Sequence, residues 1–196
     1  MQLTGHITVD SLMGLEAYSK YRQTHKAEVM AHRQIRTVRL GDHMSLQFES
    51  ETTIRYQIQE MLRIEKIFDE AGIQQEIDAY AALVPDGSNW KATMFLEYPQ
   101  AQARKLALSQ LIGVEDRLFI EVDGHVRVHA IADEDLVREN ADKTSAVHFV
   151  RFELNQEMRS AIKSGARVSV GCDHPAYTAM KTMESACVNA LRQDLK

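Results

Sequence analysis

The chain has few of the residues that brace small secreted proteins, and it lacks the signals that direct export. Its 196 residues contain two cysteines, Cys172 and Cys187, fewer than a disulfide scaffold of this size normally carries. The opening stretch MQLTGHITVDSL has no basic segment followed by an apolar one, so no signal peptide is predicted. No apolar run approaches the roughly 20 residues that span a bilayer. We therefore expect a reduced, cytoplasmic protein with no membrane association.

An excess of positive charge is also missing. The 28 Asp and Glu residues outnumber the 23 Lys and Arg residues, which gives a formal net charge of -5. Nucleic-acid binding needs clustered cations that displace counterions, so this balance argues against it.

The sequence motifs of common enzyme classes are also missing. The chain has no G-x-G-x-x-G, G-x-S-x-G, H-E-x-x-H or Cys-x-x-Cys motif, and ADKTS lacks the glycines of a phosphate loop. No enzyme class is indicated by a motif.

What is present is a regular change between helical and strand-like periodicity. The length suits a single domain over 1–196, with a helical N-terminal segment at 10–35 that packs on it. The strands come in neighbouring pairs, which favours an α+β fold with a mainly antiparallel sheet and several helices. Segments with strand periodicity lie at about 36–50, 89–98, 116–132, 145–154 and 167–172.

The apolar positions of two hairpins predict their registers. In the first hairpin, Leu40 should pair with Met44 across a three-residue loop, because both must face the same side. In the second, a three-residue loop at 123–125 keeps the apolar residues on one face and places Glu121 opposite Arg127. A slip of one residue would turn every side chain to the other face.

Three further elements are predicted from their boundaries. The N-terminal segment divides into helical stretches at 12–22 and 25–36, and residues 52–72 form one long helix that ends near Gly72. The segment RVSVG at 167–171 is predicted as the last strand, with Pro175 redirecting the chain toward a C-terminal helix.

Eight histidines are the main compositional oddity. His43, His125 and His174 fall at or just after strand ends, and His148 lies within a strand. Histidine is the commonest metal ligand, so these four are candidate ligands for a transition metal ion. The strand-end ligands converge only if those ends lie on one edge of the sheet. The alternative is that histidine simply suits exposed turns.

A second metal-like spacing lies on the N-terminal helix. His25, Glu28 and His32 stand at i, i+3 and i+7, so all three project from one helix face. The alternative interpretation is a polar face on which Glu28 lies near two exposed histidines.

The predicted long helix carries a polar stripe made of Gln57, Glu60 and Arg63. If this stripe faces the sheet, it forms a buried polar network that needs partners from the strands. Both a structural ion pair and a catalytic role are open for such a network. The candidate partners are Glu97, His148 and Arg151.

The stretch GCDHPAY places three residues with ligand or nucleophile chemistry in a row. In an extended segment, Cys172 and His174 lie on one side and Asp173 on the other, so the three do not form a ready triad. A thiolate at Cys172 requires exposure and a lowered pKa, and the neighbouring Asp173 opposes that. The alternative is a buried cysteine that acts as a small hydrophobe.

Five segments together resemble one family. They are YQIQEMLRIEKIFDEAGI, LVPDGSNWKATMFLEYP, LIGVEDRLFIEV, AIADEDLVRENADKTSAVHFVRFEL and GCDHPAYTAM. In this order they are similar, over nearly the whole chain, to the bacterial family known as domain of unknown function 3501. The resemblance transfers no activity or catalytic residue. It implies genes that lie beside a rubrerythrin-like protein and an iron–sulfur protein of the heterodisulfide-reductase type, and hence a role near peroxide defence, iron or redox metabolism.

Three functional hypotheses follow. The first is an accessory protein that binds a rubrerythrin-like or iron–sulfur partner, or a metal, in such a system. The second is a metal-dependent enzyme with histidine and carboxylate ligands. The third is a small-molecule-binding module with a pocket between the long helix and the sheet. A homodimer is the default expectation for the assembly, because closed homo-oligomers are common.

Overall fold

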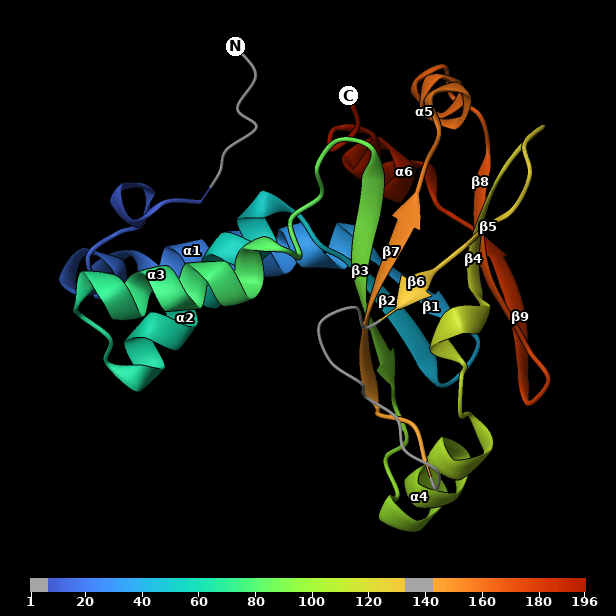
Figure 1. Cartoon of the computed structure of the whole chain (residues 1–196), viewed down its shortest axis with the longest axis horizontal. Helices are drawn as coiled ribbons and strands as arrows, with labels where there is room; N and C mark the ends of the chain where they lie inside the picture. Colours follow the sequence, from blue (N-terminus) through green and yellow to red (C-terminus); the bar gives the residue numbers. More distant parts are fainter. Residues whose placement is uncertain (1–6, 133–142) are drawn as a thin grey trace.

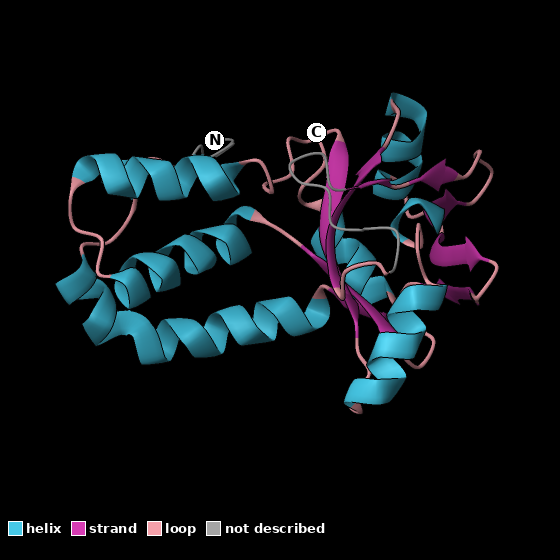
Figure 2. Cartoon of the chain, turned by 60° about the horizontal axis from the view of Figure 1, so that its bottom comes forward, coloured by secondary structure: helices cyan, strands magenta, loops and turns pink. Residues whose placement is uncertain are grey.

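A computed structural model describes residues 7–132 and 143–196 of the chain. The described residues form a sandwich of two antiparallel sheets, from which a helical arm projects (Figure 1). Figure 2 shows the three long helices of the arm on one side and the strands on the other. The predicted α+β class with antiparallel strands is confirmed, although the strands are divided between two sheets.

The first sheet has the strand order β1-β2-β3-β7-β6. Each strand runs antiparallel to its neighbour, so the central strands β2, β3 and β7 are hydrogen-bonded along both edges. Its strands are β1 (Thr37–Leu40), β2 (Met44–Phe48), β3 (Asn89–Leu96), β6 (Ile131–Ala132) and β7 (Val147–Glu153).

The second sheet has the strand order β5-β4-β8-β9. It is also antiparallel throughout, and β9 forms one of its edges. Its strands are β4 (Leu118–Val122), β5 (Val128–His129), β8 (Val168–His174) and β9 (Tyr177–Thr182).

Both predicted hairpin registers are confirmed. Leu40 pairs with Met44, and the three-residue loop between them begins with Gly41 at a φ of 69°. Strands β4 and β5 pair in the predicted register, and Arg127 lies 3.2 Å from the Glu121 carboxylate. Val126 does not join the apolar face, because 86% of its surface is exposed at the end of the hairpin.

Two strand boundaries differ from the prediction. The segment 116–132 is more than one hairpin, because its last residues leave the second sheet and form β6 in the first. The prediction that the last strand ends near Cys172 is wrong. Strand β8 continues to His174, and a tight turn at Pro175 leads into β9. Most of β9 is exposed, so it lacks the strong apolar alternation that identifies a half-buried strand.

Three helices and a single 3-10 turn lie against the sandwich. They include α5 (Gln156–Lys163), which begins as the sequence predicts, because the Asn155 side chain accepts a hydrogen bond of 2.9 Å from the Met158 amide. The others are α4 (Ala101–Gln110), the C-terminal α6 (Ser185–Arg192) and, as a single 3-10 turn, η2 (Glu115–Arg117).

The helical arm consists of α1 (Leu15–Ile35), α2 (Glu51–Glu65) and α3 (Glu70–Ala81), with the short 3-10 turn η1 (Val9–Ser11) beside α3. Helix α1 is continuous, whereas the sequence predicted two stretches. It packs along α2, and α2 also packs against α3, so α2 is the central helix. Among the described residues, no helix is both long and apolar enough to cross a membrane.

The predicted long helix ending at Gly72 is wrong, because it is two helices. Lys66 adopts a left-handed conformation with a φ of 56° and ends α2. The Asp69 side chain then accepts a hydrogen bond of 2.8 Å from the Gly72 amide and begins α3. Gly72 therefore lies inside the first turn of the next helix.

The two parts have separate hydrophobic clusters. The sandwich cluster fills the space between the two sheets and includes the fully buried Trp90 and Phe152. The arm cluster is small and lies between α2, α3 and the residues before α1. Its buried members are Ile7, Ile54, Ile58, Leu62 and Ile77.

Candidate functional site

The strand-end histidines lie in different surroundings. The His43 ring stacks on Tyr98 with centroids 4.1 Å apart, and its Nδ1 lies 3.1 Å from the Glu97 carbonyl oxygen. His125 lies in the β4–β5 turn, where its backbone amide donates to the Val122 carbonyl. The contacts of both residues therefore lie in or beside the turns at their strand ends.

His174 has partners for both ring nitrogens. Its Nδ1 accepts a hydrogen bond of 3.1 Å from the Ala176 amide, so the proton of the neutral ring is on Nε2. That nitrogen lies 3.2 Å from the Ile112 carbonyl oxygen and donates to it. The ring therefore closes the β8–β9 turn and ties it to the end of α4.

His148 is fully buried in a polar cluster inside the sandwich. Its Nε2 lies 2.8 Å from the Thr144 hydroxyl, and its Nδ1 lies 3.7 Å from the Glu115 carboxylate. Glu115 is itself only 5% exposed. The cluster brings one imidazole and one carboxylate together in a region of low dielectric.

These four histidines therefore have separate sets of neighbours. Over residues 7–132 and 143–196, no group of three or more His, Cys, Asp or Glu side chains has an arrangement that could hold a metal ion. The metal site predicted from His43, His125, His174 and His148 stays a prediction.

The alternative helix-face set is also divided. The His25 ring stacks on Tyr21 and lies 3.9 Å from the Glu28 carboxylate. His32 instead points to α2, where its Nε2 lies 2.9 Å from the Ser50 hydroxyl that begins that helix. Burial, reinforced by nearby arginines, lowers the pKa of His32, so its neutral form is favoured.

The predicted polar stripe on the long helix faces α1 rather than the sheet. The Glu60 carboxylate accepts hydrogen bonds from Arg22 at 2.7 and 2.8 Å and from the Tyr18 hydroxyl at 2.7 Å. Arg63 adds a weaker contact of 3.3 Å from the same helix, and Gln57 lies half-buried one turn earlier. The hydrogen bonds from Arg22 are the main cause that lowers the pKa of Glu60 to about 2.

The strand residues expected to complete this network make other contacts. Glu97 accepts a hydrogen bond of 3.1 Å from the Ser45 hydroxyl. Arg151 pairs with Glu153 on the same strand. Arg151 therefore forms an ion pair within the sheet, away from the Glu60 stripe.

The predicted alternation along GCDHPAY is confirmed. Cys172 is 1% exposed on the inner face, and burial raises the pKa of its thiol to about 11. Asp173 lies on the outer face, 3.5 Å from Arg127. Glycine is required at position 171, just before them, because a Cβ there would run into the ring of Phe119.

Arg36 is a buried cation that the sequence analysis did not identify. It is 2% exposed and ends α1, where its guanidinium donates to the carbonyl oxygens of Phe48, Glu49 and Ala190. It also pairs with Asp194, whose own burial raises its pKa. No local motif marks this arginine, because its acceptors are distant in sequence.

Glu49 is a second buried polar residue at the base of the arm. Its carboxylate accepts hydrogen bonds from Thr93 at 2.7 Å and from Gln47 at 3.2 Å, and a further bond from Thr53 in the first turn of α2. Together with Arg36, this carboxylate fixes the point where the arm leaves the sandwich.

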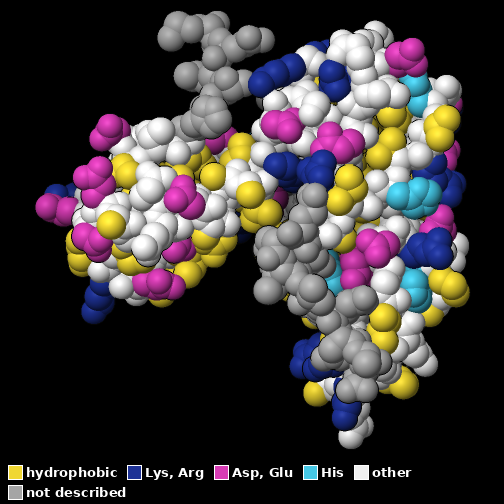
Figure 3. Space-filling model, in the orientation of Figure 1, with side chains coloured by type: hydrophobic (Ala, Val, Ile, Leu, Met, Phe, Trp, Pro, Cys, Tyr) yellow, Lys and Arg dark blue, Asp and Glu magenta, His cyan; other side chains and the backbone are white. Residues whose placement is uncertain are grey.

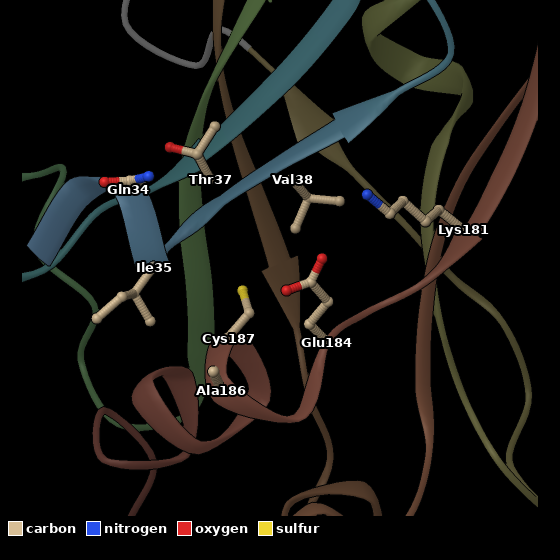
Figure 4. A pocket seen from close by; sticks show the side chains of 8 residues that line it. All are labelled: Gln34, Ile35, Thr37, Val38, Lys181, Glu184, Ala186 and Cys187. Atoms are coloured by element: carbon tan, nitrogen blue, oxygen red, sulfur yellow. The ribbon is translucent and has the colours of Figure 1, made fainter. Parts of the chain in front are cut away.

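A pocket of about 380 Å³ lies where the edge strands β1 and β9 approach the ends of α1 and α6 (Figure 4). The buried thiol of Cys187 faces this space, and burial raises its pKa to about 11. The predicted pocket was between the long helix and the sheet, whereas this one is at the open side of the sandwich. It is lined by Gln34, Ile35, Thr37, Val38, Lys181, Glu184, Ala186 and Cys187.

Taken together, the fold defines a two-sheet α+β protein with a protruding three-helix arm and buried polar clusters at their junction. The chain belongs to the family described as protein of unknown function (DUF3501), whose model matches residues 6–195. It is similar to a solved structure titled as a novel protein of unknown function from Burkholderia pseudomallei K96243. That chain is 54% identical, the match covers 97% of this chain and all of that one, and the TM-score is 0.93. No curated protein matches the chain.

Proposed function

We propose that this chain is an accessory protein that docks a protein partner through the far end of its helical arm. The observation that carries the proposal is a group of large apolar side chains left in solvent at that end. They are Met13, Ile64 and Phe68, and we call this group the arm tip.

The three residues lie at one end of the arm. Ile64 is in the last turn of α2, and Phe68 lies between α2 and α3. The backbone of Met13 is held to α2 by the Gln59 side chain, with hydrogen bonds of 2.8 and 3.1 Å. Phe68 is 72% exposed, Ile64 58% and Met13 45%, so none contributes much to the arm's own core. Clustered exposed apolar side chains are typical of interaction surfaces.

The charges around the arm tip define the chemistry of the partner. Four carboxylates and two lysines, Lys20 and Lys66, lie near the arm tip in the sequence, and Lys20 is paired with Glu16 at 2.7 Å. Figure 3 shows acidic and hydrophobic side chains together on the visible face of the arm. A complementary partner presents an apolar hollow with a basic rim. The carboxylates are Glu16, Glu65, Asp69 and Glu70.

The chemistry of the thiols supports docking over nucleophilic catalysis. Burial raises the pKa of both Cys172 and Cys187 to about 11, so neither supplies a thiolate near neutral pH. The resemblance to the family implies a rubrerythrin-like or iron–sulfur protein as the partner, in peroxide defence or iron metabolism.

Binding of the purified rubrerythrin-like protein from the same organism tests the proposal. We expect measurable binding by the unmodified chain and at least a tenfold weaker Kd for the double variant Ile64→Ser, Phe68→Ser, since apolar anchors dominate such interfaces. Leu106→Ser is the matched control, because Leu106 is 61% exposed on α4 at the sandwich. The proposal is contradicted if the chain binds neither this protein nor the iron–sulfur protein. It is also contradicted if Leu106→Ser weakens binding as much as the double variant does.

A second candidate, a metal-dependent role, is favoured by the buried His148–Glu115 pair. Elemental analysis of protein purified without a histidine tag tests it. We expect His148→Ala to lose any bound transition metal and His25→Ala to retain it. Less than about a tenth of an equivalent of metal before and after reconstitution contradicts this role.

A further inference from the structure

Within residues 7–132 and 143–196, the edge strand β9 pairs with β8 alone, so its other side is unpaired. Strand β8 pairs with it in an unbroken antiparallel register. The first pair joins Ser169 to Thr182, and the last joins His174 to Tyr177. The Met183 amide donates to the Val168 carbonyl at 2.9 Å, which makes that pair a hydrogen-bonded one. Hydrogen-bonded pairs alternate along an antiparallel ladder, so the amides and carbonyls of Thr178, Met180 and Thr182 point away from β8.

This edge carries few of the features that protect edge strands. In β9 the register has no bulge, the strand contains no proline, and Lys181 is its single charged residue. Met180 is 52% exposed at its centre. A regular strand edge of this kind is a template for pairing with another strand.

The sequence of the edge is nearly symmetric about Met180. Residues 178–182 read Thr-Ala-Met-Lys-Thr, so the segment is close to a palindrome. When two copies pair antiparallel about a two-fold axis at Met180, each Thr178 lies opposite Thr182 of the other copy. The methionines then lie opposite each other, and Lys181 lies opposite Ala179. No like charges are directly opposed, and Thr–Thr and apolar pairs are favourable across strands.

We propose that β9 is a homodimer interface, at which the four-stranded sheets of two copies join into one continuous sheet. The outward groups of Thr178, Met180 and Thr182 would form about six hydrogen bonds between the chains. A two-fold interface of this kind is self-complementary, as closed dimers require. The surface is distinct from the arm tip, so this proposal does not depend on the proposed function.

The pocket beside β9 supports the same assembly. Lys181 and Glu184 both line this space (Figure 4). Ile35 lines the opposite wall and is 49% exposed, which extends the interface with apolar surface beyond the strand. At the other end of β9 the two sheets are already tied together, because the Tyr177 hydroxyl donates to the Leu40 carbonyl at 2.6 Å.

Sedimentation velocity on the full chain from 1 to 100 µM tests the proposal. We expect the unmodified protein to be a dimer. Met180→Lys and Met180→Glu should each be monomeric, because like charges are opposed at the axis, whereas an equimolar mixture of the two should dimerise again. This rescue separates a lost interface from a misfolded chain. Leu106→Ser is the control that should remain dimeric.

A cross-link gives an independent readout. Residues opposed in a hydrogen-bonded pair have Cα atoms about 5.5 Å apart, which suits a disulfide. Met180→Cys should therefore form a covalent dimer under mild oxidation. The unmodified chain should not, since its own thiols are buried. A monomer at 100 µM overturns the proposal, as does a dimer that survives Met180→Lys. Binding of an added extended peptide with no self-association would assign the edge to another protein and also overturn it.

Discussion

The sandwich and the arm are held together by different kinds of interaction. Among the described residues, the sandwich buries a continuous hydrophobic cluster contributed by both sheets and three helices, whereas the arm's own cluster has five buried members. The α1–α2 seam depends on Arg22, Tyr18 and Glu60, together with the aromatic contact between His25 and Tyr56. Burial of apolar surface is the dominant source of stability, so the arm is the weaker part.

This difference between the two parts indicates that α1 can separate locally from α2 while the sandwich stays folded. The hydrogen-bonded and ion-paired groups of the seam lose little when it separates in water, because they are then solvated. The sandwich has no such alternative for its buried apolar surface. We therefore expect amide hydrogens in α1 to exchange faster than those in β3 and β7.

The largest expected effect is in the sandwich. Trp90 is 1% exposed, and its indole nitrogen donates to the Leu191 carbonyl at 3.0 Å. Trp90→Ala should lower the free energy of unfolding by about 3–5 kcal/mol, through lost burial and the cavity left behind. Urea denaturation followed by circular dichroism measures it. A loss below about 1 kcal/mol would show that the sandwich core is not the main source of stability.

The junction between the two parts should be nearly as sensitive. Arg36→Ala removes the cation that faces the partly buried Asp194 and leaves three backbone carbonyls without their donor. We expect a loss of about 3 kcal/mol, because breaking a buried pair leaves an uncompensated charge. The control Arg39→Ala, whose side chain is 69% exposed, should cost less than about 0.5 kcal/mol. Equal losses for the two arginines would contradict the role of Arg36.

The arm seam should respond more weakly and locally. Glu60→Gln should cost about 1–2 kcal/mol near neutral pH and should speed hydrogen exchange in α1 while leaving β3 unchanged. The folded-state pKa of Glu60, about 2, lies below the ordinary value of 4.5. Its contribution is therefore complete above about pH 4.5 and is lost as the pH falls toward 2.

The matched control for the seam is Glu65→Gln, because Glu65 is exposed in the last turn of the same helix. It should change the free energy of unfolding by less than about 0.5 kcal/mol. If the difference between the unmodified protein and Glu60→Gln does not shrink on acidification, the ion-paired seam is not what holds α1.

The smallest effect concerns His32, which connects α1 to Ser50, the residue that caps the start of α2. Its folded-state pKa is lowered from 6.5, mainly by burial, so the unfolded chain binds a proton more readily. The stability associated with the neutral ring is present above pH 6.5 and falls as the pH drops below that value. In His32→Gln this decrease should be absent in denaturation curves between pH 7 and 5. An unchanged slope would rule out a titrating contact at this seam.

Local periodicity predicted much of the sandwich, and tertiary contacts determined the rest. The registers of the first two hairpins follow from alternating apolar residues, since one face of each must be buried. Strand β9 was missed because most of its side chains are exposed on both faces. The break between α2 and α3 was missed because Lys66–Asp69 is flanked by strong helix formers, and Lys66 adopts its left-handed conformation without a glycine.

The candidate site was predictable to the same limited extent. Glu60 stood out because it lies on a polar stripe of an otherwise amphipathic helix. Its partners Tyr18 and Arg22 could not be chosen over residues of the sheet, because helix packing is not encoded in spacing alone. The histidine sets share a spacing or a strand end, but neither property determines where a ring points.

The Arg36–Asp194 pair also has a consequence for synthesis. The two residues are separated by 158 positions, so at the usual rates of translation Arg36 is made roughly 10–30 s before its carboxylate. The helices of the arm and the contacts of Arg36 with the Phe48 and Glu49 carbonyls can form in that interval, but its acceptors Ala190 and Asp194 are made last. The junction between the arm and the sandwich is therefore completed only when the C-terminal segment has left the ribosome.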